Sequence, residues 1–86
     1  MSKTEKFIFK LLAGGADSNI RFDDLVSLLS QLGFEERVRG SHHIFRKPGI
    51  HEKINLQVDG SKAKPYQVRQ VRVVLIKYKM IGRFNV

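Results

Sequence analysis

Two adjacent histidines, His42 and His43, lie in the stretch RVRGSHHIFRKP, which covers residues 37–48. The cations on either side of them are Arg37, Arg39, Arg46 and Lys47. An imidazole can accept or donate a proton near neutral pH, and guanidinium and ammonium groups bind phosphate. Together they could deprotonate a ribose 2′-hydroxyl and stabilise the charge of the phosphorane, which is the chemistry of RNA cleavage. A solvated surface strand would carry the same residue types.

Strand alternation separates the two histidines, because adjacent residues of a strand point to opposite faces. Phe45 is the largest apolar residue here and the best candidate for the core, which would turn His43 inward and His42 outward beside Arg46. Ile44 favours the reverse arrangement, so both histidines stay candidates for a catalytic group. Gly40 and Ser41 predict the turn of a hairpin.

Other chemistry has less support. His51 and Glu52 could extend the histidines into a metal site, but ligand spacing is missing and the surroundings are cationic, so we expect no metal and no cofactor. The acidic pairs Asp23–Asp24 and Glu35–Glu36 place their carboxylates on different faces. The sequence contains no phosphate-binding loop of the P-loop type and no Ser-His-Asp order.

The elements that must position these residues follow from hydrophobic periodicity. Helical spacing predicts helices over residues 4–13, within RFDDLVSLLSQLGF and over residues 66–81; Gly33 ends the second and Pro65 begins the third. Alternation predicts strands over residues 34–39, 42–47 and 54–59, with Phe34 and Val38 on one face of the first and Ile54, Leu56 and Val58 inward in the third. The segment GSKAKP is expected to be a polar loop.

This order, α-α-β-β-β-α, predicts an α+β domain in which helices cover one face of a three-stranded antiparallel sheet. The 86 residues suffice for one domain and one core. We expect residues 1–20 to form an N-terminal helical extension and residues 21–82 to form the main part of the domain.

The charge balance favours a polyanionic partner. Sixteen Lys and Arg residues against eight Asp and Glu residues give a net charge of +8, and residues 60–86 hold seven cations without an acid. Nucleic acid attracts such surfaces through counterion release, so RNA is the leading partner. An acidic protein partner is the alternative, and many small basic proteins are simply soluble.

The chain offers no signal of export or membrane insertion. It lacks cysteine, which excludes disulfides and thiolate metal sites and fits a reducing cytoplasm. No apolar run approaches the roughly 20 residues of a membrane span, and Lys10 interrupts the short apolar stretch near the N-terminus. We therefore expect a cytoplasmic protein without membrane contact.

Three pieces of the sequence resemble the HicA (YcfA-like) toxins of bacterial toxin–antitoxin pairs. They are an amphipathic helix ending in Leu-Gly-Phe, a Gly-Ser-His-His-x-Phe strand, and KPYQVRQVRVVLIKY after a basic loop. The resemblance covers roughly residues 22–80. Many members carry a second histidine in or just after the third strand, where this chain has Gln57, Val58 and Asp59.

The resemblance implies a double-stranded-RNA-binding-domain-like fold and a metal-independent mRNA interferase, an endoribonuclease whose catalytic residue is a histidine of this motif. Carried over, that residue is His42, with His43 as the fallback. A HicB-type antitoxin would bind the toxin and block the site. We expect the RNA phosphates to be held by Arg37, Arg39, Gly40, Ser41, Arg46, Lys47, Lys62 and Lys64.

Two rival functions remain open. A non-catalytic RNA-binding module would show the same basic surface but leave RNA intact. A protein-interaction subunit would instead present its cationic face to an acidic protein.

Overall fold

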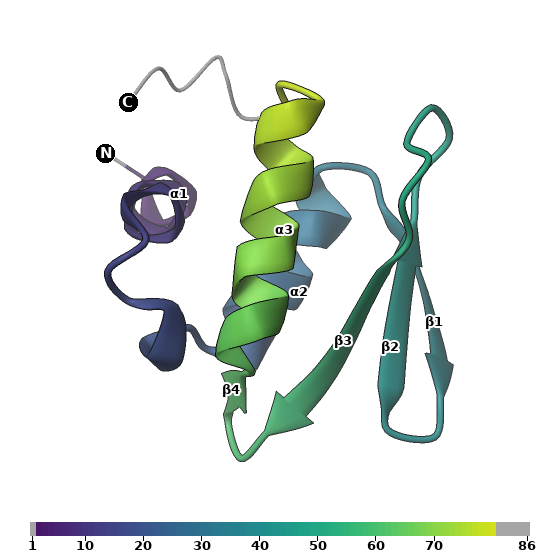
Figure 1. Cartoon of the computed structure of the whole chain (residues 1–86), viewed down its shortest axis with the longest axis horizontal. Coiled ribbons are helices and arrows are strands. Elements are labelled where there is room, and N and C mark those ends of the chain that lie inside the picture. Colours follow the sequence, from purple (N-terminus) through teal and green to yellow (C-terminus); the bar gives the residue numbers. More distant parts are fainter. Residues whose placement is uncertain (1, 81–86) are drawn as a thin grey trace.

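The computed structural model describes residues 2–80 and forms an α+β domain with three helices and one antiparallel sheet (Figure 1). The helices are α1 (Lys3–Ala13), α2 (Phe22–Gln31) and α3 (Pro65–Lys77), and a short 3-10 turn, η1 (Asp17–Asn19), follows α1. The strands are β1 (Glu35–Arg39), β2 (His42–Arg46), β3 (Ile54–Asp59) and β4 (Lys62–Ala63), in the spatial order β1-β2-β3-β4.

The fourth strand corrects the prediction of a three-stranded sheet. The segment expected to be a loop contributes β4, which pairs with β3 through Val58 opposite Ala63 and Asp59 opposite Lys62. Ala63 is buried, and its backbone amide donates to the carbonyl of Ile20 at 2.9 Å. Two residues are too few to show alternation, and this strand depends on contacts with the distant start of α2.

The helices begin and end where their caps require. Ser2 and Glu5 form a reciprocal capping box at the start of α1, and Pro65 occupies the first turn of α3. Gly33 follows α2 with a φ of +94°, and the amide of Phe34 donates to the carbonyl of Leu29. This Schellman arrangement confirms Gly33 as the helix stop. The prediction that α3 continues to residue 81 is wrong, because the helix ends at Lys77 and Tyr78 is its C-cap residue.

The core lies between the helices and the inner face of the sheet. Phe45, Ile54 and Leu56 are fully buried there, and the same cluster includes Ile8 and Leu11 of α1. The expectation that Val58 points into the core is wrong in degree. Val58 is 45% exposed, because β3 extends beyond β2 there and pairs with β4. Val38, on edge strand β1, is 55% exposed.

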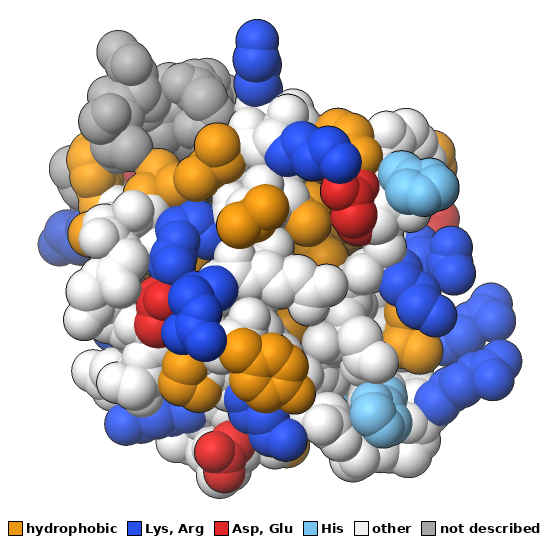
Figure 2. Space-filling view, viewed as in Figure 1, with side chains coloured by type: hydrophobic (Ala, Val, Ile, Leu, Met, Phe, Trp, Pro, Cys, Tyr) orange, Lys and Arg blue, Asp and Glu red, His pale blue; other side chains and the backbone are white. Residues whose placement is uncertain are grey.

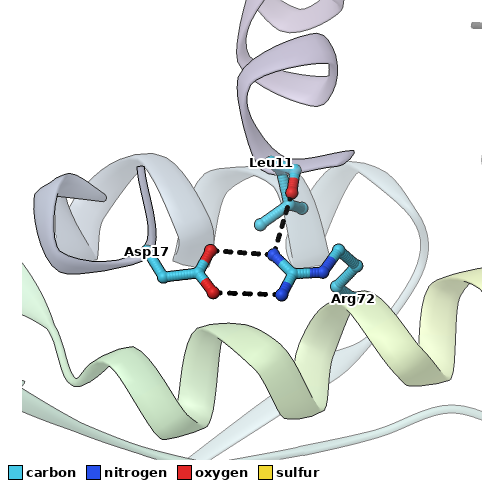
Figure 3. A network of polar contacts seen from close by, with 3 residues as sticks. All are labelled: Leu11, Asp17 and Arg72. Atoms are coloured by element: carbon cyan, nitrogen blue, oxygen red, sulfur yellow. Dashed lines mark hydrogen bonds and ion pairs between the residues drawn. The ribbon is translucent and has the colours of Figure 1, made fainter. Parts of the chain in front are cut away.

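Arg72 ties the N-terminal part of the chain to α3 (Figure 3). Its guanidinium donates two hydrogen bonds to the Asp17 carboxylate, at 2.8 and 3.0 Å, and a third to the Leu11 carbonyl at 3.1 Å. These bonds lower the pKa of Asp17 below its usual value. The network fixes the end of α1 and η1 against α3, so the N-terminal segment contributes a helix that packs into the same core.

Candidate nucleic-acid interface

The β1–β2 hairpin sets the geometry of the histidine pair. Gly40 has a φ of +59° at the first central position of the two-residue turn, as type II′ turns require. The register places Arg39 opposite His42 and Val38 opposite His43. On the other side of β2, His42 lies opposite Gln57 and His43 opposite Leu56.

His42 lies on the outer face of the sheet and is exposed, as strand alternation predicts. Its Nδ1 is 3.2 Å from Oδ1 of Asn55 on β3. An amide oxygen can only accept a hydrogen bond, so Nδ1 donates, and the lone pair of the neutral ring is left on Nε2. An imidazole held in this tautomer presents a proton acceptor to the solvent.

His43 lies on the inner face, where its ring packs edge-on against Phe22 with 4.9 Å between the centroids. Its Nδ1 donates to Oε2 of Glu36 at 2.7 Å, and its side chain is 25% exposed. The alternation that sends Phe45 into the core therefore also sends His43 inward. This carboxylate–imidazole pair links β1 and β2 beside the start of α2.

Arginines gather on the outer face near His42. A pocket there is lined by Glu35, Glu36, Arg37, Arg39, Ile44, Arg46 and Lys53. Figure 2 shows Lys and Arg side chains concentrated where the β1–β2 hairpin lies, with a histidine close by. Lys53 is an addition to the sequence-based set, although it could have been found, since it shares a face with Asn55 two residues later.

Lys47 does not join this group. Its Nζ donates to the carbonyl of Leu32 at 2.6 Å, at the end of α2. A cation there satisfies one of the carbonyls that the helix end leaves without an intrahelical partner. The expected phosphate contact of Lys47 would require this bond to break, because its ammonium is engaged on the helix side.

A second polar cluster adjoins His42 and joins Ser41, Gln57 and Lys64. The Gln57 amide donates through Nε2 to Oγ of Ser41 at 3.2 Å, and its Oε1 accepts from Nζ of Lys64 at 3.3 Å. Gln57 is the direct cross-strand neighbour of His42, so the Lys64 ammonium is brought towards the histidine. The sequence does not predict Gln57 or Asn55 as neighbours of His42, because only the strand register brings them beside it. Lys62 lies exposed on β4, opposite Asp59.

The remaining histidine belongs to a different contact. The backbone amide of His51 donates to the Tyr78 hydroxyl, which itself donates to Glu52. Lys77 pairs with the same carboxylate at 2.7 Å, and these two partners lower the pKa of Glu52 to about 2. The 49–53 loop is thus tied to the end of α3. Among residues 2–80, no three His, Cys, Asp or Glu side chains are grouped so as to hold a metal ion.

The fold and the outer face define a small α+β protein with a basic sheet surface that exposes one oriented imidazole. A family model described as the HicA toxin of bacterial toxin–antitoxin matches residues 22–78, well over half of the chain. The chain therefore belongs to the HicA toxin family, a family of toxins that pair with an antitoxin. Comparison with curated proteins and with solved structures found no match. No helix within residues 2–80 is both long and apolar enough to cross a bilayer.

Proposed function

We propose that this toxin is a metal-independent endoribonuclease that cleaves mRNA, and that a HicB-type antitoxin restrains it. One observation carries the proposal. His42 is exposed on the basic face of the sheet, and Asn55 orients its ring so that Nε2 is free to take a proton. Family membership supports the toxin class, and the geometry supports His42 over His43 as the reacting group.

The proposed reaction begins when Nε2 of His42 removes the proton of a ribose 2′-hydroxyl. The 2′-oxygen then attacks the adjacent phosphorus, and the bond from phosphorus to the 5′-oxygen breaks. The imidazolium returns its proton to that leaving oxygen. The products are a 2′,3′-cyclic phosphate and a 5′-hydroxyl, and His42 ends the cycle neutral. A positioned acid–base group of this kind contributes about 10²–10⁴ in rate.

The phosphorane carries additional negative charge, and we assign its stabilisation to Lys64. Gln57 holds the Lys64 ammonium through a hydrogen bond and faces His42 directly across β2 and β3. A fixed cation at the point where charge develops lowers the barrier without a cost of reorganisation. Gln57 acts in this scheme as a positioning residue, in the segment where many family members carry a second histidine.

The arginines Arg37, Arg39 and Arg46 would hold neighbouring phosphates along the outer face. Gly40 and Ser41, at the tip of the hairpin, would let the RNA backbone come close to His42. Contacts of this kind position a substrate and do not read its sequence. Lys62 would extend the surface beyond β3, whereas Lys47 would contribute only after releasing the end of α2.

Incubation of purified protein with mRNA tests the proposal. Wild type, His42→Ala, His43→Ala and His51→Ala are compared after circular dichroism has shown that each is folded. We expect only His42→Ala to abolish cleavage, and we expect 2′,3′-cyclic phosphate ends on the wild-type products. Cleavage by His42→Ala at the wild-type rate would exclude His42 as the reacting group.

Intact RNA in every sample, with salt-sensitive RNA binding retained, would favour the non-catalytic RNA-binding module instead. Absence of RNA binding at every salt concentration would favour a protein-interaction subunit. The double-stranded-RNA-binding-domain-like fold implied by the resemblance also stays a prediction.

A further inference from the structure

Helix α3 exposes three large apolar side chains on the side that faces the solvent, among the polar residues Arg69, Gln70 and Lys77. Val68, Val71 and Leu75 are fully buried against the sheet and the other helices. On the opposite side, Tyr66, Val73 and Ile76 are 56%, 62% and 55% exposed. Figure 2 shows hydrophobic side chains along the exposed side of this helix.

These exposed residues form a straight row. Tyr66, Arg69, Val73 and Ile76 follow one another at intervals of three, four and three residues, which places them on one face of a helix. We call these four residues the α3 stripe. A surface helix normally turns polar residues to the solvent, and a helix that is apolar on all sides is normally buried. The 3-4-3 spacing is that of a seam between two packed helices.

The charge of α3 determines what can cover the stripe. The helix carries Arg69, Arg72 and Lys77 and no acidic residue. Arg72 and Lys77 are paired with Asp17 and Glu52, whereas Arg69 is exposed within the stripe. A second copy docked by a two-fold axis would place the two Arg69 side chains near each other, on chains that each carry a net charge of +8. An acidic partner is attracted to Arg69 by its opposite charge, whereas a second copy of the toxin is repelled.

We propose that the α3 stripe docks an amphipathic helix of the antitoxin, which lays an apolar seam on Tyr66, Val73 and Ile76 and sets acidic residues beside Arg69. The proposal rests on the toxin–antitoxin family and not on RNA cleavage. Because α3 packs against the inner face of the sheet, its exposed side points away from the outer face that carries His42. Docking at the stripe is thus a separate contact from any cover of His42.

Titration with the antitoxin encoded in the reading frame beside this gene tests the proposal. The toxin variants are Val73→Lys and Ile76→Lys, and Val38→Lys on β1 is a matched control, because Val38 is 55% exposed. We expect each α3 variant to weaken antitoxin binding about tenfold or more, as loss of a central contact does, and the control to bind like wild type. Equal binding by all four proteins would overturn the proposal.

Two further measurements separate antitoxin docking at the stripe from RNA cleavage and from dimerisation of the toxin. The α3 variants should cleave RNA as wild type does, and His42→Ala should bind the antitoxin normally. If wild type does not cleave RNA, the antitoxin titration still decides the docking proposal. Analytical ultracentrifugation of the toxin alone shows whether a second copy of the chain covers the stripe. A wild-type dimer that Val73→Lys dissociates would assign the stripe to a second copy and overturn the docking of an antitoxin helix.

Discussion

Two neighbouring imidazoles have different environments because they lie on opposite faces of one strand. His42 has an amide partner and an open ring face, whereas His43 has a carboxylate partner and an aromatic ring against it. The Glu36 carboxylate anchors the His43 ring between the two strands, and the Asn55 amide oxygen fixes the orientation of the His42 ring. The RNA cleavage that we propose therefore uses His42, which faces outward, whereas His43 joins β1 to β2 beside α2.

Replacement of Asn55 tests the orientation of His42. Asn55→Ala should lower kcat for RNA cleavage about tenfold to a hundredfold with little change in KM, because the ring loses its fixed tautomer and position. Asn55→Asp keeps an oxygen acceptor and should retain most of kcat, while its negative charge raises KM for RNA. Single-turnover and steady-state kinetics measure both constants. Equal loss of kcat in the two variants would argue against an orienting role.

The turn between α2 and β1 depends on the backbone conformation of a single glycine, Gly33. Gly33 ends α2 in the left-handed region, and a Cβ at this position would lie 2.7 Å from Nζ of Lys47. The turn therefore needs glycine both for its φ and for the bond from Lys47 to Leu32. This short connection delivers the chain from α2 into β1, the first strand of the hairpin.

A glycine substitution measures that requirement. Gly33→Ala should lower the free energy of unfolding by about 1 to 2 kcal/mol, the usual cost of the left-handed conformation for a residue with a Cβ. Gly15→Ala is the control, because Gly15 has open space and no positive φ. Urea unfolding monitored by circular dichroism gives both values. A similar loss at the two positions would contradict the assignment.

The Asp17–Arg72 pair makes an acid-sensitive link between η1 and α3. The pKa of Asp17 is lowered from 3.8 because Arg72 donates hydrogen bonds to its carboxylate. A lowered pKa stabilises the fold above the ordinary value, and that contribution is lost as the pH falls through the value in the folded protein. The link should therefore be at full strength at neutral pH and vanish in strong acid.

Asp17→Asn should destabilise the protein by about 1 to 2 kcal/mol at neutral pH, after allowance for partial exposure of the pair. The difference from wild type should shrink as the pH falls below 3.8, because the wild-type carboxyl then becomes neutral as well. Denaturant unfolding over a series of pH values follows this change. A difference that stays constant into acid would show that the charge of Asp17 does not matter.

The distribution of charge over the whole molecule is more specific than its net value of +8. Arg72 and Lys77 neutralise acids within the fold, and Lys47 serves a helix end. The outer face keeps a group of cations that is available to a polyanion, and the α3 stripe presents a different, mostly apolar surface. The two proposals therefore place RNA and the antitoxin helix on different faces of one small domain.

The salt dependence of RNA affinity measures how many phosphates the outer face of the sheet contacts. Each neutralised phosphate of single-stranded RNA contributes about −0.7 to the slope of log K against log salt. Arg39→Ala should reduce the magnitude of that slope by about 0.7, because one phosphate contact is lost. Lys6→Ala removes the same charge from the exposed side of α1 and serves as the control. Fluorescence anisotropy with labelled RNA gives the slopes; equal slopes for the two variants would show that binding responds to net charge alone.

The local pattern of the sequence predicts the three helices and the hairpin, and it separates the two histidines onto opposite faces. Periods of 3.6 and 2 residues are local properties, and Gly33, Gly40 and Pro65 mark where elements end, turn and begin. The size of Phe45 favours the arrangement with His42 outward, whereas Ile44 favours the reverse; the burial of Phe45 in the folded protein decides between them. The Gly-Ser-His-His motif also led to the family that the comparison with family models confirms.

Tertiary structure alone decided the fourth strand and the partners of each side chain. The placement of Asn55 and Gln57 beside His42, of Lys47 at the end of α2, and of Glu36 on His43 depends on strand register and on contacts between distant segments. The two-residue turn at Gly40 and Ser41 fixes the register of β1 against β2, whereas the long connection over residues 47–53 leaves the register of β3 against β2 to tertiary packing. The residues that could do chemistry are therefore readable from the chain, whereas their partners come into reach only when the strands pair.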